Sequence, residues 1–250
     1  MEFNNTVAVV TGGADGIGLA SAQRLRSLGA QVVIADVDEI KVEQQANTHG
    51  FVGVVCDVSD EDDISNLAKI ANELGEVSFV MANAGVAVGG RFEHVPIDEW
   101  QRLFEVNVHG VVRTVNAFLP DMLERERGRL VVTGSSAGLF VSDGFNVPYA
   151  ASKHALLALS QGLMSYCQAS NVQVHYLAPR ITDTAFPRTS IAWGRRGSRV
   201  THDRELGSDF DTVDDVVDAF FHGMANDDFL ISLTPDTKER MQSELSVLLE

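Results

Sequence analysis

Short hydrophobic runs alternate with longer amphipathic segments along most of the chain. The runs are nearly continuous in apolar and β-branched residues, which is typical of strands that are buried on both faces of a parallel sheet. They predict strands at 7–10, 31–36, 53–56, 77–82, 129–134, 172–178 and 229–233. The segments between them predict helices at 18–28, 61–74, about 97–125, 149–169 and 213–224.

This alternation predicts an α/β fold. Parallel strands joined by helices need right-handed crossovers, which build a Rossmann-type doubly wound sheet with helices on both faces. About seven parallel strands are expected. Because no repeat, low-complexity tract or linker interrupts the chain before residue 180, we expect residues 1–250 to form a single domain.

Charge and composition then exclude several classes of protein. A net charge of −16 argues against nucleic acid or an anionic membrane as the main partner. The apolar runs fall short of the roughly 18 residues that a membrane span requires, and the N-terminus lacks the basic start of a signal peptide. Two cysteines and seven histidines show no spacing typical of a disulfide framework or a metal site. We therefore expect a cytoplasmic protein without a metal.

The first predicted strand runs directly into the glycine-rich stretch "TGGADGIG" at 11–18. Gly12, Gly16 and Gly18 lie where the strand must turn into a helix, and glycine allows positive φ and close approach of a ligand there. The helix that follows offers free N–H groups and a partial positive charge to a pyrophosphate. The alternative is a tight turn that binds nothing, but the place of the turn between strand and helix favours a dinucleotide site.

Two acidic residues bear on which dinucleotide is bound. Asp36 ends the second predicted strand, where a carboxylate accepts hydrogen bonds from a ribose 2′-hydroxyl and repels a 2′-phosphate. Asp15 stands inside the turn, where a phosphorylated ribose would favour a basic residue. The alternative for Asp36 is a solvated loop acid. Together the two acids predict NAD in preference to NADP.

The stretch "YAASK" at 149–153 places a phenol and an ammonium one helical turn apart. Residues four apart lie on the same face of a helix, so Tyr149 and Lys153 stand side by side. By itself such a pair is either an accident of an amphipathic surface or a catalytic base with its activator.

Six stretches in this order resemble the short-chain dehydrogenase/reductase family over roughly residues 5–235. They are "TGGADGIG", "CDVSD" (56–60), "ANAG" (82–85), "FEVNVHG" (104–110), "GRLVVTGSSAG" (128–138) and "YAASK". The resemblance implies a catalytic set of Asn107, Ser135, Tyr149 and Lys153. It implies cofactor contacts from Gly12, Asp15, Gly16, Ile17, Gly18, Asp36, Asp57, Val58, Asn83, Ala84, Gly85, Tyr149, Lys153 and Thr184. Ala82 departs from the asparagine that the family has there.

The catalytic serine has two candidates. Alignment on the strand, with Gly138 three residues later, selects Ser135, whereas a spacing of thirteen residues before the tyrosine selects Ser136. We prefer Ser135 because the phase of the strand is fixed better than the length of the loop that follows.

The implied chemistry is hydride transfer between nicotinamide and a carbinol carbon. A free phenol has a pKa of about 10, so a nearby ammonium is expected to lower the pKa of Tyr149. The serine would orient the reacting oxygen, and Asn107 would hold a water in a proton relay to Lys153. The sequence thus predicts an NAD-dependent enzyme that interconverts a secondary alcohol and a ketone. Rival readings are a carbonyl or 3-oxoacyl-type reductase and a non-catalytic, NAD-binding regulatory protein.

The resemblance also implies a homodimer or homotetramer and a substrate lid around residues 184–205. The stretch 180–204 holds six arginines against two aspartates, a local balance of 6 − 2 = +4, so one hypothesis is that it meets an anionic substrate. A solvated loop is the alternative. Arg180 replaces a glycine of the family pattern and would be strained if the position needed positive φ. A helical tail is expected at 235–250.

Overall fold

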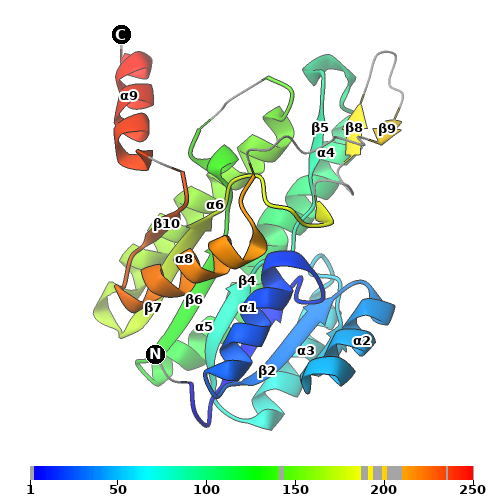
Figure 1. The fold of residues 1–250 in the computed structure, drawn as a ribbon, viewed down its shortest axis with the longest axis vertical. Helices are drawn as coiled ribbons and strands as arrows, with labels where there is room; N and C mark the ends of the chain where they lie inside the picture. The colour runs from blue at the N-terminus through cyan, green and yellow to red at the C-terminus, as the bar shows by residue number, and fades with distance from the viewer. Residues whose placement is uncertain are drawn as a thin grey trace.

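The computed structural model describes residues 3–140, 144–186, 191–193, 199–201, 210–234 and 236–249. Seven parallel strands form the main sheet in the order β10-β7-β6-β4-β1-β2-β3 (Figure 1). Their bounds are β1 (Val7–Thr11), β2 (Gln31–Asp36), β3 (Val52–Val55), β4 (Val77–Ala82), β6 (Gly128–Thr133), β7 (Val172–Ala178) and β10 (Leu230–Ser232). The single-domain, doubly wound fold that the hydrophobic pattern predicts is confirmed. The strand order reverses at β1, where such folds bind their ligands.

Helices cover both faces of this sheet. On one face α1 (Gly16–Ser27) and α8 (Val213–Ala225) lie side by side, with α2 (Glu39–His49) beside β2 and β3 (Figure 1). On the other face are α3 (Glu61–Leu74), α5 (Gly110–Glu124) and α6 (Val147–Tyr166). Alternate residues of β1 enter the two cores: Val7 and Val9 pack on one side, Ala8 and Val10 on the other. This two-sided burial explains the unbroken hydrophobic runs of the sequence.

The helix α2 was absent from the sequence prediction. It buries only Val42 fully, so it carries almost no apolar stripe to signal it. Its ends are nevertheless well marked. The Asp38 side chain accepts a hydrogen bond from Lys41 N at the start, and Gly50 adopts a left-handed conformation at the end.

The helix expected at about 97–125 is interrupted. It divides into α4 (Ile97–Phe104), a π-helical turn η2 (Glu105–His109) and α5. A single π turn within an α-helix often marks a functional site. This turn contains Asn107, which is completely buried.

A second, smaller sheet lies beyond the main one. It consists of β5 (Val88–Gly90), β8 (Ile191–Trp193) and β9 (Arg199–Thr201), with β8 parallel to β5 and antiparallel to β9 (Figure 1). Three-residue strands carry too little pattern to be read from sequence, and β5 and β8 pair across a hundred residues. The small sheet brings part of the expected lid segment against the loop that follows β4.

Short 3-10 turns and a terminal helix complete the chain. The turns are η1 (Phe92–His94), η3 (Ser136–Gly138) and η4 (Cys167–Ala169), and the helix is α9 (Thr237–Leu249). In Figure 1 α9 points away from the body of the protein, and the Arg240 guanidinium lies 4.2 Å from the ring centre of Phe140. Within the described residues no helix is both long and apolar enough to cross a bilayer.

Candidate active site

The turn between β1 and α1 needs its glycines for different reasons. Gly12 and Gly16 have φ of +62° and +53°, a region that other residues rarely adopt. Gly18 has no such φ, but a Cβ there would lie 2.2 Å from the carbonyl oxygen of Gly12. Ile17, which lies between Gly16 and Gly18, is partly buried and packs against the core under α1. The turn thus presents bare backbone at the N-terminus of α1.

Asn83 and Thr11 hold this turn against β4. The Thr11 hydroxyl accepts hydrogen bonds from the backbone N–H groups of Asn83 (3.0 Å) and Ala84 (3.2 Å). The Asn83 side-chain amide donates to the carbonyl oxygens of Thr11 and Gly12, both at 3.1 Å. Asn83, expected to contact the cofactor, therefore has its amide group directed at the turn itself, where it fixes the backbone.

Asp36 lies beside the same turn at the end of β2. One of its carboxylate oxygens accepts from Ala14 N at 3.3 Å and the other from Asp38 N at 3.2 Å. A carboxylate accepts more than two hydrogen bonds, so Asp36 keeps capacity for a ribose hydroxyl. Its place next to the glycine turn is the one that the sequence predicts.

Asp15 is paired with a lysine that the sequence analysis did not consider. Its carboxylate accepts from Gly16 N at 2.7 Å, which caps α1, and from Lys41 Nζ at 2.7 Å. The hydrogen bond with Asp15 and the charges of Asp38 and Asp36 raise the pKa of Lys41. Lys41 comes from the first turn of α2, a helix that left no pattern, so no signal in the sequence pointed to it.

The predicted cofactor contacts Asp57 and Val58 follow β3. Asp57 accepts hydrogen bonds from the Ser59 backbone (2.9 Å) and hydroxyl (2.6 Å), which closes a tight turn. The side chain of Val58 is buried, and a Cβ on Gly110 would lie 2.6 Å from Val58 Cγ2. Val58 therefore rests directly on the start of α5, whereas the Asp57 backbone N–H donates to the Asp63 carboxylate of α3 at 2.9 Å.

Asn107 joins the loop after β4 to α6. Its amide donates to the Val86 carbonyl (2.9 Å) and to the Ser152 hydroxyl (3.1 Å), and its oxygen accepts from Val86 N (2.8 Å). A Cβ on Gly85 would lie 3.2 Å from Asn107 Oδ1 and 3.6 Å from Lys153 Nζ. Both amide hydrogens of Asn107 are thus used within the protein, and only oxygen acceptors remain for the expected relay water.

Tyr149 and Lys153 meet beside this loop. The Lys153 ammonium is buried, donates to the Thr133 carbonyl at 2.9 Å and lies 5.7 Å from the centre of the Tyr149 ring. Burial lowers the pKa of Lys153 to about 8 and raises the pKa of Tyr149 to about 12. The expectation that Lys153 lowers the pKa of Tyr149 is not met in this structure, because burial removes water from both groups and disfavours both charges.

Ser135 is the serine that contacts Tyr149. Burial is the main cause of the raised pKa of Tyr149, and the hydrogen bond between the Ser135 side chain and Tyr149 acts in the opposite direction. Ser135 Oγ also accepts from Ala137 N at 3.1 Å, which caps η3. Ser136 N donates to the Pro179 carbonyl at 2.8 Å, which ties the segment to the end of β7. The geometry thus favours Ser135 over Ser136 for contact with a reacting oxygen.

The start of the expected lid reaches both halves of the site. A Cβ on Gly16 would lie 2.9 Å from Thr184 Cγ2, so Thr184 stands against the glycine turn. Its hydroxyl accepts from Phe186 N at 3.2 Å, and the Phe186 ring centre lies 6.0 Å from that of Tyr149. Thr184 and Phe186 therefore link the turn to the tyrosine.

Arg180 is free of the strain that its place in the pattern suggested. It is not among the residues with positive φ, and its guanidinium lies 3.9 Å from the Asp211 carboxylate. Arg188, Arg195, Arg196 and Arg204 lie outside the described residues, and the side chain of Arg199 is not described.

An apolar wall stands next to Tyr149. It is a cluster of buried Val88, Val95 and Leu103 with partly buried neighbours. Those neighbours are Val86, Trp100, Tyr149 and Trp193. Among the described residues, no group of three or more metal-ligating side chains occurs.

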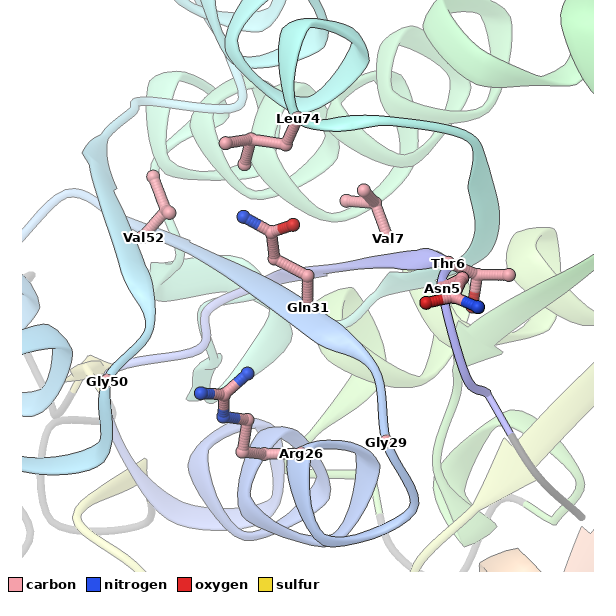
Figure 2. A pocket seen from close by; sticks show the side chains of 9 residues that line it. All are labelled: Asn5, Thr6, Val7, Arg26, Gly29, Gln31, Gly50, Val52 and Leu74. Atoms are coloured by element: carbon pink, nitrogen blue, oxygen red, sulfur yellow. The ribbon is translucent and has the colours of Figure 1, made fainter.

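The pocket in Figure 2, of about 440 Å³, lies elsewhere. Its walls come from the amino ends of β1, β2 and β3 and from the ends of the adjoining helices, opposite the glycine turn. They are lined by Asn5, Thr6, Val7, Arg26, Gly29, Gln31, Gly50, Val52 and Leu74. None of the predicted site residues is among them.

Known proteins resemble this chain in sequence and in fold. The profile of the short chain dehydrogenase family matches residues 6–194. The 1-deoxy-11-beta-hydroxypentalenate dehydrogenase of Streptomyces avermitilis is 33% identical over 98% of this chain and 91% of its own. A short-chain dehydrogenase/reductase from Burkholderia phymatum, solved in complex with NAD, is 28% identical with a TM-score of 0.87, over 99% of this chain and 96% of that one. A short-chain dehydrogenase from Sphingobium yanoikuyae, solved with NADPH, shares the fold with a TM-score of 0.79 at 24% identity, over 98% of this chain and 94% of that one.

Proposed function

Because this chain belongs to the short-chain dehydrogenase/reductase family, we propose that it is an NAD-dependent enzyme interconverting a secondary alcohol and a ketone. The observation that carries the proposal is the corner formed by Tyr149, its hydrogen-bond partner Ser135 and the buried ammonium of Lys153, next to the loop after β4 that is bonded to the glycine turn. A protein that only bound a dinucleotide would gain nothing from a serine hydroxyl set against the Tyr149 phenol.

The residues of the turn fit a dinucleotide. Gly12 and Gly16 leave a cradle without side chains at the N-terminus of α1, which suits a pyrophosphate, and Asp36 suits the adenosine ribose. When bound, the nicotinamide supplies or accepts the hydride. The protein's own task is then to position the substrate and move a proton.

Tyr149 would take the hydroxyl proton during oxidation and return it during reduction. Ser135 would hold the substrate oxygen near the phenol, and the Lys153 ammonium would favour the phenolate once it forms. Because the pKa of Tyr149 is raised to about 12, the phenolate is the scarce form at neutral pH. We therefore expect oxidation to accelerate with rising pH between about 7 and 10, and reduction to show no such rise.

Preference for NAD rests on Asp36. Its carboxylate would bind a ribose 2′-hydroxyl and repel a 2′-phosphate. Lys41 is the competing feature, since a cation nearby would favour a phosphate, but Asp15 holds it at 2.7 Å. Known relatives of this fold bind either cofactor, because one was solved with NAD and another with NADPH.

Steady-state kinetics with both cofactors tests this preference. The wild type should favour NAD over NADP by at least about tenfold in kcat/KM, and Asp36→Ala should lose most of that ratio. Lys41→Ala serves as the matched control and should leave NAD turnover unchanged while weakening residual NADP turnover. A wild type that prefers NADP would contradict the assignment.

We propose further that the substrate combines an apolar body with an anionic group. The apolar wall beside Tyr149 fits the body, and the arginine-rich stretch 180–204 suits a carboxylate. The similar Streptomyces avermitilis enzyme is named for a hydroxylated carboxylate. A purely neutral ketone, as in the reductase reading, would make no use of this local positive charge.

A panel of secondary alcohols, followed by NADH absorbance, tests both proposals. Bulky alicyclic hydroxy acids should react with a kcat/KM at least about tenfold above that of their methyl esters. Equal rates for acid and ester would remove the anionic group from the proposal. Tight NAD binding without turnover of any alcohol or ketone would favour the non-catalytic reading. A homodimer or homotetramer also stays a proposal, which light scattering would test.

A further inference from the structure

A second buried tyrosine stands behind the catalytic corner. Tyr176 in β7 is completely buried and is one of the largest side chains in the core. Its hydroxyl donates a hydrogen bond to the Lys153 carbonyl oxygen at 3.0 Å. Hydrogen bonding with the Ser135 backbone opposes the rise that burial causes in the pKa of the same phenol. One hydroxyl thus connects the residue before η3 to the helix that carries the catalytic pair.

The surrounding backbone leaves room for this phenol and for nothing more. A Cβ on Gly134 would lie 2.0 Å from Tyr176 Cζ and 2.1 Å from its oxygen. A Cβ on Gly138 would lie 2.4 Å from the same oxygen and 2.7 Å from the Lys153 carbonyl oxygen. Two glycines, one on each side of Ser135, therefore allow the ring to reach α6. Such close fit on both sides keeps the hydroxyl at one point.

We propose that Tyr176 is a positioning residue of the active site, whose hydroxyl fixes the Ser135 segment against α6 and so sets the distance between Ser135 and Tyr149. This inference rests on the proposed function. Tyr176 touches neither substrate nor reacting atoms. It acts through the backbone of Ser135 and the carbonyl of Lys153. These backbone groups belong to the two residues whose side chains lie beside Tyr149.

The position requires a phenol that stays neutral. Tyr176 must keep its proton to donate to the Lys153 carbonyl, and burial raises its pKa well above the ordinary value for tyrosine. Ionised Tyr149 would raise the pKa of Tyr176 further. When Tyr149 becomes a phenolate, Tyr176 therefore remains a donor, and the two tyrosines hold different protonation states.

A purely structural reading is that the Tyr176 ring fills the core between β7 and α6. Phenylalanine fills the same space without the hydroxyl, so Tyr176→Phe separates the two readings. We expect this variant to lower kcat for alcohol oxidation by about tenfold, since small displacements of reacting groups are costly. The KM for NAD should stay unchanged because the glycine turn is not involved.

The pH profile gives a readout that a loss of packing would not move. Because the Ser135 hydrogen bond lowers the pKa of Tyr149, a looser Ser135 should shift the alkaline inflection of oxidation to higher pH. In a Ser135→Ala background, Tyr176→Phe should cause no further shift, since the route through Ser135 is already cut. Tyr166→Phe, at a tyrosine that is 70% exposed, is the matched control and should change neither rate nor profile.

The proposed function and the role of Tyr176 can fail separately. If the wild type turns over no alcohol or ketone, the proposed function fails and this inference fails with it. If the wild type is active while Tyr176→Phe keeps its rate and its pH inflection, only the inference is overturned, even when the variant is less stable. The inference would also be overturned if Tyr176→Phe shifted the alkaline inflection by the same amount in the wild type and in the Ser135→Ala variant.

Discussion

The glycine turn and the corner of Tyr149, Ser135 and Lys153 differ in how they use their polar groups. At the turn, the side chains of Asn83 and Asp15 form hydrogen bonds within the protein. Asn83 donates to the backbone, and Asp15 accepts from the backbone and from Lys41. In the corner, Lys153 and Tyr149 are ionisable groups held away from water, with pKa values moved to about 8 and about 12. The polar groups of the turn therefore stabilise its backbone conformation. In the corner, by contrast, burial disfavours the charged forms of both Lys153 and Tyr149. Stability and chemistry are divided between the two regions.

The largest effect is expected from removing the phenol in the corner. Tyr149→Phe should reduce oxidation and reduction by at least about 10³-fold, because the variant lacks the phenol that the Ser135 side chain contacts and that would transfer the proton. The folded state should be unharmed, since the ring remains and no buried charge is lost. Turnover assays together with NAD titration by fluorescence check this.

The rate loss alone does not complete that test. If Tyr149→Phe also lost NAD affinity, the rate loss would reflect a disturbed cofactor site. Retention of the parental rate by this variant would remove Tyr149 from the chemistry altogether.

A smaller but still severe effect is expected at the turn, where shape matters more than charge. Gly18→Ala would place a methyl group 2.2 Å from the Gly12 carbonyl oxygen, so the turn must move. We expect NAD to bind about 10²-fold more weakly and the free energy of unfolding to fall by about 1–3 kcal/mol. Calorimetric titration and thermal unfolding measure the two.

Gly162 in α6 offers the matched control for that variant. A Cβ there meets no atom within 4 Å, so Gly162→Ala should stabilise the protein by up to about 1 kcal/mol and leave NAD affinity unchanged. Equal NAD affinities in the two alanine variants would show that the turn does not bind the dinucleotide.

The smallest effect concerns stability in the corner. Burial lowers the pKa of Lys153 to about 8, so between pH 8 and about 10.4 the unfolded chain holds more protons than the folded one, and stability should rise with pH. Lys153→Met removes a cost of roughly 3 kcal/mol at neutral pH, but it also leaves the Thr133 carbonyl without its donor. The two effects oppose each other, so we expect a net change within about 2 kcal/mol.

The diagnostic is the slope, measured by denaturant unfolding at several pH values. Wild type should gain stability from pH 8 to 10, and Lys153→Met should not. Lys41→Met is a suitable comparison and should keep the gain in stability. Lys41 lies near the surface, and because Asp15 raises its pKa, Lys41 is not a source of that gain. A wild type with no gain in this window would mean that Lys153 is more hydrated than its burial indicates.

The sequence by itself determined the main sheet, the glycine turn and the pairing of Tyr149 with Lys153. These depend on local patterns: hydrophobic runs for strands buried on both faces, glycines where β1 enters α1, and a four-residue spacing on one helix. The seven main strands were all located, because each carries enough apolar residues to signal itself. The family resemblance added Ser135 and Asn107, whose roles stay predictions.

Only the tertiary structure decided what surrounds those residues. It placed Lys41 on Asp15, brought the π turn of Asn107 to Ser152, built the small sheet from strands of three residues and set Tyr176 behind Ser135. It also reversed the expected direction of the Tyr149 pKa. Burial and long-range pairing are sums over the whole packed chain, so no short stretch of sequence carries them.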